Sequence, residues 1–198
     1  MIKSFKIFAF LLTGTFLLSS CDADIPVATL KVKYQKSNSE FIDIDGMPVH
    51  TIVEGKLDDS LPIVFIHGTS ASLHTWDTLS SLLKANKKII RFDLPAFGLT
   101  GPNRLNQYNF NFYNQFLDEF LSKLNVTQCI VAGNSLGGSI AWNYTIASPD
   151  KVKQLILLDA SGYPKKDEKG SLGFKLAAIP VLNQALKHIS PISLIRKS

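Results

Sequence analysis

A serine between two glycines, placed after an apolar run and before a helix-like segment, constrains this chain most. Residues 129–132 predict a buried strand and residues 138–142 the start of a helix. Glycine at positions 133 and 137 leaves room for so tight a turn, so the hydroxyl of Ser135 projects from the end of the strand. The alternative is an ordinary Gly/Ser turn in a doubly wound sheet. In this strand-turn-helix setting we favour a nucleophilic serine.

Two backbone N–H groups are candidates to stabilise an oxyanion beside that serine. Leu136 begins the helix, so its N–H is free to point at a developing negative charge. A second donor is expected after the apolar strand 61–66, where the sequence reads His-Gly-Thr, and we assign it to Thr69. His67 has a second possible role, which is to hold this loop through a hydrogen bond. The residues predicted to line a pocket are His67, Gly68 and Asn134.

A third motif, Asp93-Leu94-Pro95-Ala96-Phe97-Gly98, ends the apolar strand that begins at Ile89. Together with His-Gly-Thr and Gly-Asn-Ser-Leu-Gly-Gly, in this order, it resembles the α/β-hydrolase fold family from about Glu40 to the C-terminus. The family usually has glycine where this chain has Ala96, so at this position the resemblance does not predict the geometry of the local turn. The resemblance implies an α/β fold with a mostly parallel sheet and flanking helices. It also implies a serine hydrolase with a Ser, acid and His triad in that chain order, acting by acyl transfer to water.

The triad partners of Ser135 are not identified in this chain. The family pattern implies an acid after a later strand and a histidine near the end of a longer chain, beyond a helical cap. Here only His188, in a cap-like segment, follows Ser135. An unassisted serine is a poor nucleophile. We therefore expect an incomplete fold in which the last two strands are absent and the acid and base lie beyond Ser198.

Other side chains are weighed as substitutes. Asp159 follows an apolar strand and is a candidate triad acid, although an Asp there more often caps a turn. His50 lies in an early strand and is not expected to act as a base. His74 and Trp76 are expected to pack around the first helix, with a pocket-lining role as the alternative.

The N-terminus predicts secretion and lipid attachment. Lys3 and Lys6 precede an apolar run, residues 7–18, that is too short to span a bilayer. Leu-Ser-Ser-Cys, ending at Cys21, resembles the bacterial lipobox, in which the cysteine is lipidated and becomes the new N-terminus. This implies a lipid-anchored protein of the bacterial cell envelope with the membrane surface as a partner. The alternative is a plain secretory signal with an incidental cysteine.

Composition excludes several partners. The formal net charge of +5 falls by two when Lys3 and Lys6 leave with the signal, and the remaining lysines are scattered. Nucleic-acid binding has no support. Cys129 falls in a buried strand, so no disulfide framework is expected. No cysteine or histidine cluster has metal-ligand spacing, and we expect no metal and no cofactor.

The chain divides into four predicted parts. They are a lipoprotein-type signal peptide (1–20), a tether (21–39), the N-terminal part of an α/β-hydrolase core (40–162) and the start of a cap (163–198). The last part contains apolar helical pieces separated by Pro180 and Pro191. Its alternative role is a pair of helices on a membrane surface.

Within the core, residues 39–46 alternate apolar and polar side chains and end in Asp-Gly, which predicts a hairpin to strand 47–53. Later apolar runs alternate with helical segments, so we expect a mostly parallel sheet of six strands. Helices are expected at 76–83 and 111–124. The second carries an apolar stripe predicted to pack on the sheet, made of Phe112, Phe116, Phe120 and Leu124.

Two classes of function follow. The first is a lipid-anchored serine hydrolase acting on a small-molecule substrate, with ester and carbon–carbon bonds both left open. Family members that act on epoxides and haloalkanes usually have an Asp nucleophile, so Ser135 argues against those reactions. The second is a catalytically silent, truncated hydrolase-like lipoprotein or binding protein.

Overall fold

The computed structural model describes residues 25–162 and residue 179. Its elements lie in one compact unit, residues 27–164. In chain order they are α2 (Val27–Tyr34), β1 (Ser39–Ile44), β2 (Met47–Gly55), β3 (Ile63–Ile66), the 3-10 helix η1 (Leu73–Trp76), α3 (Asp77–Leu83), β4 (Lys88–Phe92), α4 (Phe110–Lys123), β5 (Cys129–Asn134), α5 (Leu136–Ala147) and β6 (Val152–Leu158).

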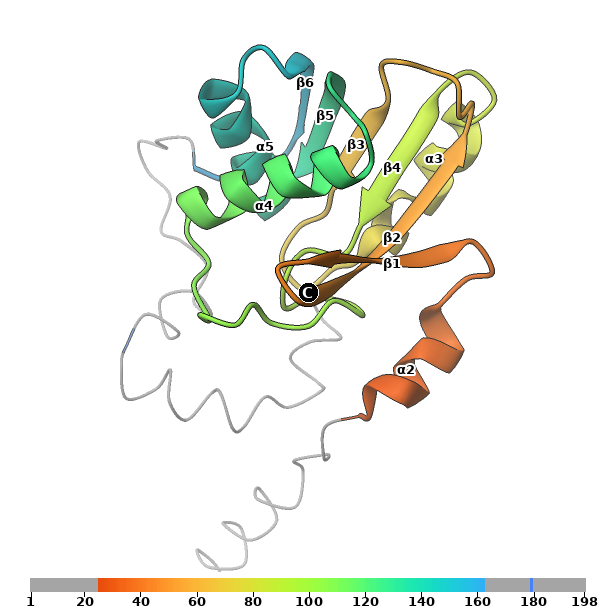
Figure 1. Ribbon diagram of the computed structural model, residues 1–198, viewed down its shortest axis with the longest axis vertical. Coiled ribbons are helices and arrows are strands. Elements are labelled where there is room, and N and C mark those ends of the chain that lie inside the picture. The colour runs from red at the N-terminus through yellow and green to blue at the C-terminus, as the bar shows by residue number, and fades with distance from the viewer. Residues whose placement is uncertain (1–24, 163–178, 180–198) are drawn as a thin grey trace, which may run out of the picture. The chain divides into compact units, whose positions relative to one another are not determined.

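The strands form one six-stranded mixed sheet with the order β1-β2-β4-β3-β5-β6 (Figure 1). Strand β3 pairs in parallel with β4 and β5, and β5 pairs in parallel with β6. Strand β2 runs antiparallel to both β1 and β4. Parallel neighbours require crossover connections, which the helices supply. The α/β-hydrolase fold expected from the sequence, with six strands and flanking helices, is confirmed.

The first two strands form the predicted hairpin. Ile44 faces Met47 in the register, so the connection has two residues. Those residues, Asp45 and Gly46, have φ values of 50° and 74°. Two left-handed residues in a two-residue loop match the right-handed twist of the flanking strands, which is why Asp-Gly is favoured there.

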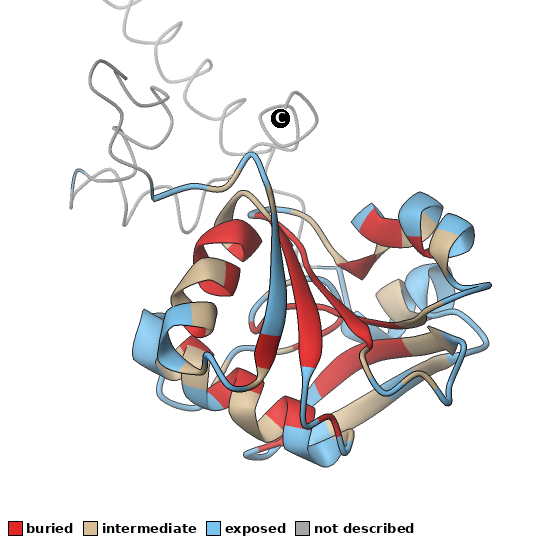
Figure 2. Ribbon diagram, turned by 90° about the horizontal axis from the view of Figure 1, so that it is seen from above, coloured by how far each residue is buried: buried red, intermediate tan, exposed pale blue. Residues whose placement is uncertain are grey.

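Apolar side chains are buried on both faces of the central strands. Along β3, Val64 and Ile66 belong to the larger core, which includes residues of α4 and α5. Ile63 and Phe65 belong to the smaller core with Trp76. Parallel strands covered on both faces are continuous apolar runs, as these are. Figure 2 shows the buried residues gathered on these central strands.

Helix α4 carries the predicted aromatic stripe. Phe116 and Phe120 are 3% and 0% exposed, while Phe112 and Leu124 are partly buried against the same core. The helix begins where the side chain of Asn109 accepts a hydrogen bond from the N–H of Phe112 at 2.9 Å. The stripe therefore anchors α4 on the sheet as the sequence predicted.

Helix α2 lies inside the segment predicted as a tether and was not expected. It buries none of its residues. Three contacts attach its C-terminal end to the rest of the unit: Lys31 Nζ lies 4.1 Å from the centroid of the Phe41 ring, the Tyr34 carbonyl lies 2.9 Å from Nε2 of His74, and Lys36 Nζ lies 2.7 Å from an Asp77 carboxylate oxygen. Residues 1–24, with the predicted signal and Cys21, lie outside the described residues, as does the predicted cap except Ile179.

Strand β6 forms an edge of the sheet within the described part of the chain. Three of its apolar side chains, Leu155, Ile156 and Leu158, are 36%, 44% and 36% exposed. Exposed apolar edges favour association with other strands. None of the helices between residues 25 and 162 is long and apolar enough to cross a membrane.

Candidate functional site

Ser135 occupies the sharp turn between β5 and α5. Its φ of 51° and ψ of −114° place a non-glycine residue in the left-handed half of conformational space. Such a conformation costs about 1–3 kcal/mol and persists only where the surroundings impose it. The half-buried side chain makes no hydrogen bond with the described residues. The hydroxyl is therefore presented at the end of β5 without a structural partner there.

Close backbone contacts explain the glycines around this turn. A Cβ on Gly133 would overlap the carbonyl oxygen of Gly137, and a Cβ on Gly137 would overlap that of Ile66. A Cβ on Gly138 would lie 2.5 Å from the Cβ of Ala160. The start of α5 thus packs directly on the ends of the strands, and only glycine permits it.

The two predicted oxyanion donors flank the serine in different ways. Leu136 is the first residue of α5, and its N–H donates no hydrogen bond to the described residues. The loop after β3 passes beside the turn, because a Cβ on Gly68 would lie 3.1 Å from the Cβ of Ser135. Thr69 is the next residue, is exposed, and leaves its N–H equally unpaired within the described chain. The structure therefore brings this loop and the serine together.

His67 is fully buried and ties two loops together. Its Nε2 accepts a hydrogen bond from the N–H of Leu94 at 2.9 Å, so Nδ1 carries the proton and donates to the Gly68 carbonyl at 2.8 Å. Burial is the main cause that lowers the pKa of this ring. His67 thus has the loop-holding role that the sequence allowed, and no exposed surface with which to line a pocket.

Asn134 lies between the serine and the edge strand. Its side-chain amide donates to the carbonyl of Leu158 at 3.1 Å, and the backbone N–H of Ser135 donates to the same carbonyl at 3.1 Å. The side chain is half-buried, and its oxygen faces Gly68. It therefore connects β5, β6 and the loop after β3 next to the serine.

A buried His–Asp pair is the part of this region that the sequence did not reveal. Asp93, 1% exposed, accepts hydrogen bonds from His50 Nδ1 at 2.7 Å and from the N–H groups of Leu73 and Leu99 at 2.7 and 2.8 Å. Burial raises the pKa of this carboxyl, but the hydrogen bonds, above all that of His50, outweigh it and hold the pKa below its usual value. Asp93 therefore holds the ends of β2 and β4 and the start of η1 together.

The left-handed loop after β4 accommodates the departure from the family pattern. Ala96 has a φ of 68°, the conformation that glycine adopts most easily. Its N–H still donates to the carbonyl of Gly101 at 3.0 Å. Gly98 has a φ of 55°, and a Cβ there would overlap the carboxylate of Asp93. The alanine is thus tolerated, whereas the second position requires glycine.

No histidine in the described part of the chain serves Ser135 as a base. Each of the three uses both ring nitrogens in contacts elsewhere. Their partners are Asp93 and Ser39 for His50, Gly68 and Leu94 for His67, and Asp77 and Tyr34 for His74. His188 lies outside the described residues.

The structure also places the other residues that the sequence singled out. Asp159 is exposed at the end of β6, with a φ of 46°, and forms no ion pair with any described residue. Trp76 is 2% exposed and stacks on Phe65 with ring centroids 4.5 Å apart, which confirms its packing role. Cys129 is a buried free thiol whose pKa burial raises to about 11. Between residues 25 and 162, no group of three metal-ligating side chains is placed to hold a metal ion.

Residues 62–177, more than half of the chain, match the α/β hydrolase fold family, and the chain belongs to it. It is 29% identical over 147 residues to 1-acylglycerol-3-phosphate O-acyltransferase ABHD5 of Sus scrofa, covering 71% of this chain and 41% of that protein. It is 26% identical over 148 residues to the (lyso)-N-acylphosphatidylethanolamine lipase of Homo sapiens, covering 73% of this chain and 43% of the lipase. The chain thus spans about two fifths of the length of these relatives.

Solved structures agree on the fold. A membrane phospholipase A described as a bacterial virulence factor superposes with a TM-score of 0.63 at 22% identity, over 85% of this chain and 55% of the other. A protein from Acinetobacter baumannii proposed to be a lipase gives 0.64 at 25% identity, over 84% and 59%. The arrangement of strands and helices therefore belongs to a fold shared with these proteins.

Proposed function

We propose that the protein is a serine hydrolase that cleaves an acyl ester of a small lipid by acyl transfer to water. The carrying observation is the strained turn that presents Ser135 beside two unpaired backbone N–H groups, at Leu136 and Thr69. Ser135 is the nucleophile in this proposal. The two N–H groups stabilise the tetrahedral intermediate, and each such donor lowers the activation free energy by about 3–4 kcal/mol.

The similar proteins support an acyl substrate. The relatives are a 1-acylglycerol-3-phosphate O-acyltransferase and a (lyso)-N-acylphosphatidylethanolamine lipase, and both names describe acyl substrates. One structurally similar protein is a phospholipase. Ester cleavage is therefore favoured over carbon–carbon cleavage, although both use a serine. A lysophospholipid in place of water as acyl acceptor is the variant of this proposal that the acyltransferase suggests.

The base and acid are proposed to come from outside the described residues. A serine nucleophile needs an adjacent base held by a third group. Since the ring nitrogens of His50, His67 and His74 are all engaged elsewhere, a histidine beyond residue 162 completes the triad in this proposal. His188 or a histidine in a longer form of the protein meets that requirement.

We also propose that Cys21 is lipidated and holds the protein on a membrane of the bacterial cell envelope. The basic and apolar residues before it, and the Leu-Ser-Ser-Cys motif, support this. An anchored enzyme would meet lipid substrates at the surface where they lie. Metabolic labelling with a radioactive fatty acid tests the anchor: the wild-type chain is expected to be labelled and Cys21→Ser not.

A second candidate is a catalytically silent protein with this fold. It is favoured by the same engagement of all three described histidines, which leaves Ser135 without a base among those residues. Such a protein would bind a lipid or a partner at the Ser135 site without converting it.

A fluorophosphonate that labels activated serines separates the two candidates. The full chain is expected to be labelled at Ser135, with labelling lost in Ser135→Ala and retained in Ser37→Ala, an exposed serine outside the turn. Hydrolysis of p-nitrophenyl esters from two to twelve carbons long then reports the acyl length. If the folded 198-residue chain neither reacts with the probe nor hydrolyses any ester, these residues alone are not an active enzyme, and the silent protein is favoured for them.

A further inference from the structure

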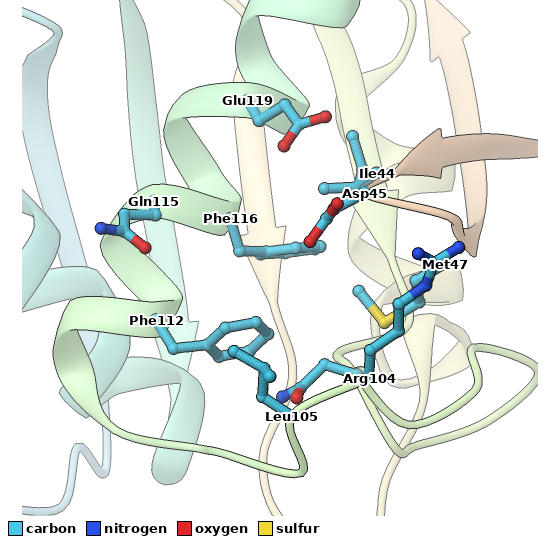
Figure 3. A pocket seen from close by; sticks show the side chains of 10 residues that line it. Ile44, Asp45, Met47, Arg104, Leu105, Phe112, Gln115, Phe116 and Glu119 are labelled. Atoms are coloured by element: carbon cyan, nitrogen blue, oxygen red, sulfur yellow. The ribbon is translucent and has the colours of Figure 1, made fainter.

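A cavity of about 170 Å³ lies between the β1–β2 hairpin, the loop 103–105 and helix α4 (Figure 3). None of its lining residues belongs to the turn at Ser135 or to the loop after β3. An apolar cavity of about 150 Å³ accommodates a molecule the size of benzene. This cavity therefore has room for a small molecule, whose charged ends can reach the polar side chains that border it.

Aromatic rings form part of its wall. Phe112 and Phe116 follow one another on α4, with ring centroids 6.2 Å apart and planes inclined by 27°. Phe116 is 3% exposed and belongs to the large core, so its ring is held firmly. Met47 of β2 lies on the opposite side of the cavity (Figure 3). The aromatic part of the wall is therefore apolar and held firmly by the core.

Two carboxylates and one guanidinium border the same cavity. Asp45 comes from the hairpin turn, Glu119 from α4 and Arg104 from the loop before α4. Figure 3 shows the carboxyl groups of Asp45 and Glu119 on one side of the Phe116 ring and the guanidinium on the hairpin side. Within the described part of the chain, none of the three forms an ion pair. Their charges are thus available to a ligand.

The hairpin turn places one of these charges. A Cβ on Gly46 would overlap Nη2 of Arg104, so the guanidinium lies directly against the turn. The turn is fixed by its two left-handed residues and by a 3.1 Å hydrogen bond from the Gly46 N–H to the Asp43 carboxylate. Gly46 thus serves the turn and also leaves space for Arg104 at the rim of the cavity.

We propose that this cavity binds a zwitterion that carries an ammonium group and a phosphate, of the phosphocholine or phosphoethanolamine type. Aromatic rings next to carboxylates bind organic ammonium groups. A guanidinium is well suited to a phosphate because its N–H groups pair with two oxygens at once. In this arrangement the ammonium lies by Phe116, Asp45 and Glu119 and the phosphate by Arg104. The site goes beyond the proposed hydrolase, since binding needs neither Ser135 nor any chemical step.

Calorimetry on the full chain in dodecyl maltoside, a detergent with neither phosphate nor ammonium, tests the site. Saturable binding of phosphocholine is expected, weakened about fivefold or more in Glu119→Gln and in Arg104→Gln, since each removes roughly 1 kcal/mol or more of interaction. Binding of choline alone is expected to weaken only in Glu119→Gln, and binding of inorganic phosphate alone only in Arg104→Gln.

Matched variants outside the cavity serve as controls. Glu40→Gln on β1 and Lys123→Gln on α4 remove one exposed charge each and are expected to leave phosphocholine binding unchanged. Should Glu119→Gln fail to fold by circular dichroism, Asp45→Asn in the exposed turn replaces it. No saturable binding to the folded wild-type chain overturns the proposal, as does equal weakening by the control variants.

Vesicles decide whether the zwitterion is part of a lipid, in an assay from which the detergent has been removed because it would dissolve them. Displacement of bound phosphocholine by phosphatidylcholine vesicles, but not by vesicles of an uncharged glycolipid, identifies a lipid headgroup. If phosphatidylcholine vesicles do not displace the bound phosphocholine, the ligand is a free phosphoammonium compound. Either result supports a site for an ammonium group and a phosphate. Displacement by the glycolipid vesicles overturns the proposal. The Ser135→Ala chain is expected to bind like wild type, so this test and that of the hydrolase fail independently.

Discussion

The ends of strands β4 and β5 belong to one sheet, yet their polar groups are treated in opposite ways. After β4, the carboxylate of Asp93 accepts three hydrogen bonds and is buried. After β5, the hydroxyl of Ser135 and the N–H of Leu136 make none with the described residues. Buried polar groups are nearly always paired, because an unpaired one costs about 1–3 kcal/mol. The comparison separates a strand end whose polar group holds the fold from one whose polar groups stay unpaired within the described residues, as the proposed nucleophile requires.

Removing the carboxylate of Asp93 breaks the paired strand end and is the largest expected effect. Asp93→Ala leaves His50 and the N–H of Leu73 without a buried acceptor, so the free energy of unfolding is expected to fall by about 3–5 kcal/mol. Urea denaturation followed by tryptophan fluorescence measures it. Asp150→Ala, an exposed acid, is the control and should change stability by less than about 0.5 kcal/mol. A loss below 1 kcal/mol would show that Asp93 does not hold this region.

The same variant carries a pH signature. Because the pKa of Asp93 is lowered in the folded chain, its contribution is fully present above the unfolded value, near pH 4, and is lost as the pH falls through the folded value. The difference between wild type and Asp93→Ala is therefore expected to shrink below pH 4. A constant difference down to pH 2 would contradict a charged carboxylate.

Gly137→Ala tests the open strand end through its backbone. The added Cβ would overlap the carbonyl oxygen of Ile66, so α5 must shift at a cost of about 2–3 kcal/mol. Labelling of Ser135 by the fluorophosphonate is expected to fall with it, since the loop that carries Thr69 adjoins that carbonyl. Gly101→Ala is the matched control, because nothing lies within 4 Å of its added Cβ. Equal stability of the two variants would mean that the turn is not held by close packing.

The two strand ends also differ in how far the sequence predicted them. The turn at Ser135 is a local pattern, because Gly133 and Gly137 are needed by contacts within the strand-turn-helix unit and the strand beside it. The pairing of His50 with Asp93 depends instead on the antiparallel register that sets Thr51 opposite Phe92, and no local pattern encodes that register.

Other outcomes follow the same rule. The Asp-Gly hairpin and the aromatic stripe of α4 were predicted because each is a local or periodic signal. Helix α2 was not predicted, because it buries no residue and its sequence carries no strong apolar period. The sequence allows two roles for His67, and only the hydrogen bond from the N–H of Leu94, 27 residues away, distinguishes them.

Replacing Ser135 by glycine tests whether the backbone of this turn is strained. Glycine adopts the φ of 51° without cost, so relief of strain should exceed the entropy that glycine adds to the unfolded chain. We expect stability to rise by about 1 kcal/mol in urea denaturation while probe labelling disappears. Ser148→Gly, at a φ of −135°, lacks that relief and is expected to lose about 0.5–1 kcal/mol. A Ser135→Gly chain less stable than wild type would show that the turn stores no strain.

The smallest effect comes from Asp77, an acid that is paired as Asp93 is but not buried. Burial raises its pKa, but hydrogen bonds from Lys36 and Arg91 outweigh burial and bring the pKa down to about 2. Its contribution is therefore present above pH 4 and lost between about pH 4 and pH 2. Because the side chain is 38% exposed, solvent screening reduces the loss in Asp77→Asn to about 1 kcal/mol or less.

Salt separates the two acids. Half-molar sodium chloride shortens the reach of exposed charges to a few ångströms, so it should remove most of the Asp77→Asn effect. The Asp93→Ala effect rests on buried hydrogen bonds and is expected to be the same with and without salt. If salt reduced both equally, the strand end after β4 would be held by long-range charge instead of by direct bonds to Asp93. Its contrast with the open end at Ser135 would then no longer distinguish structure from function.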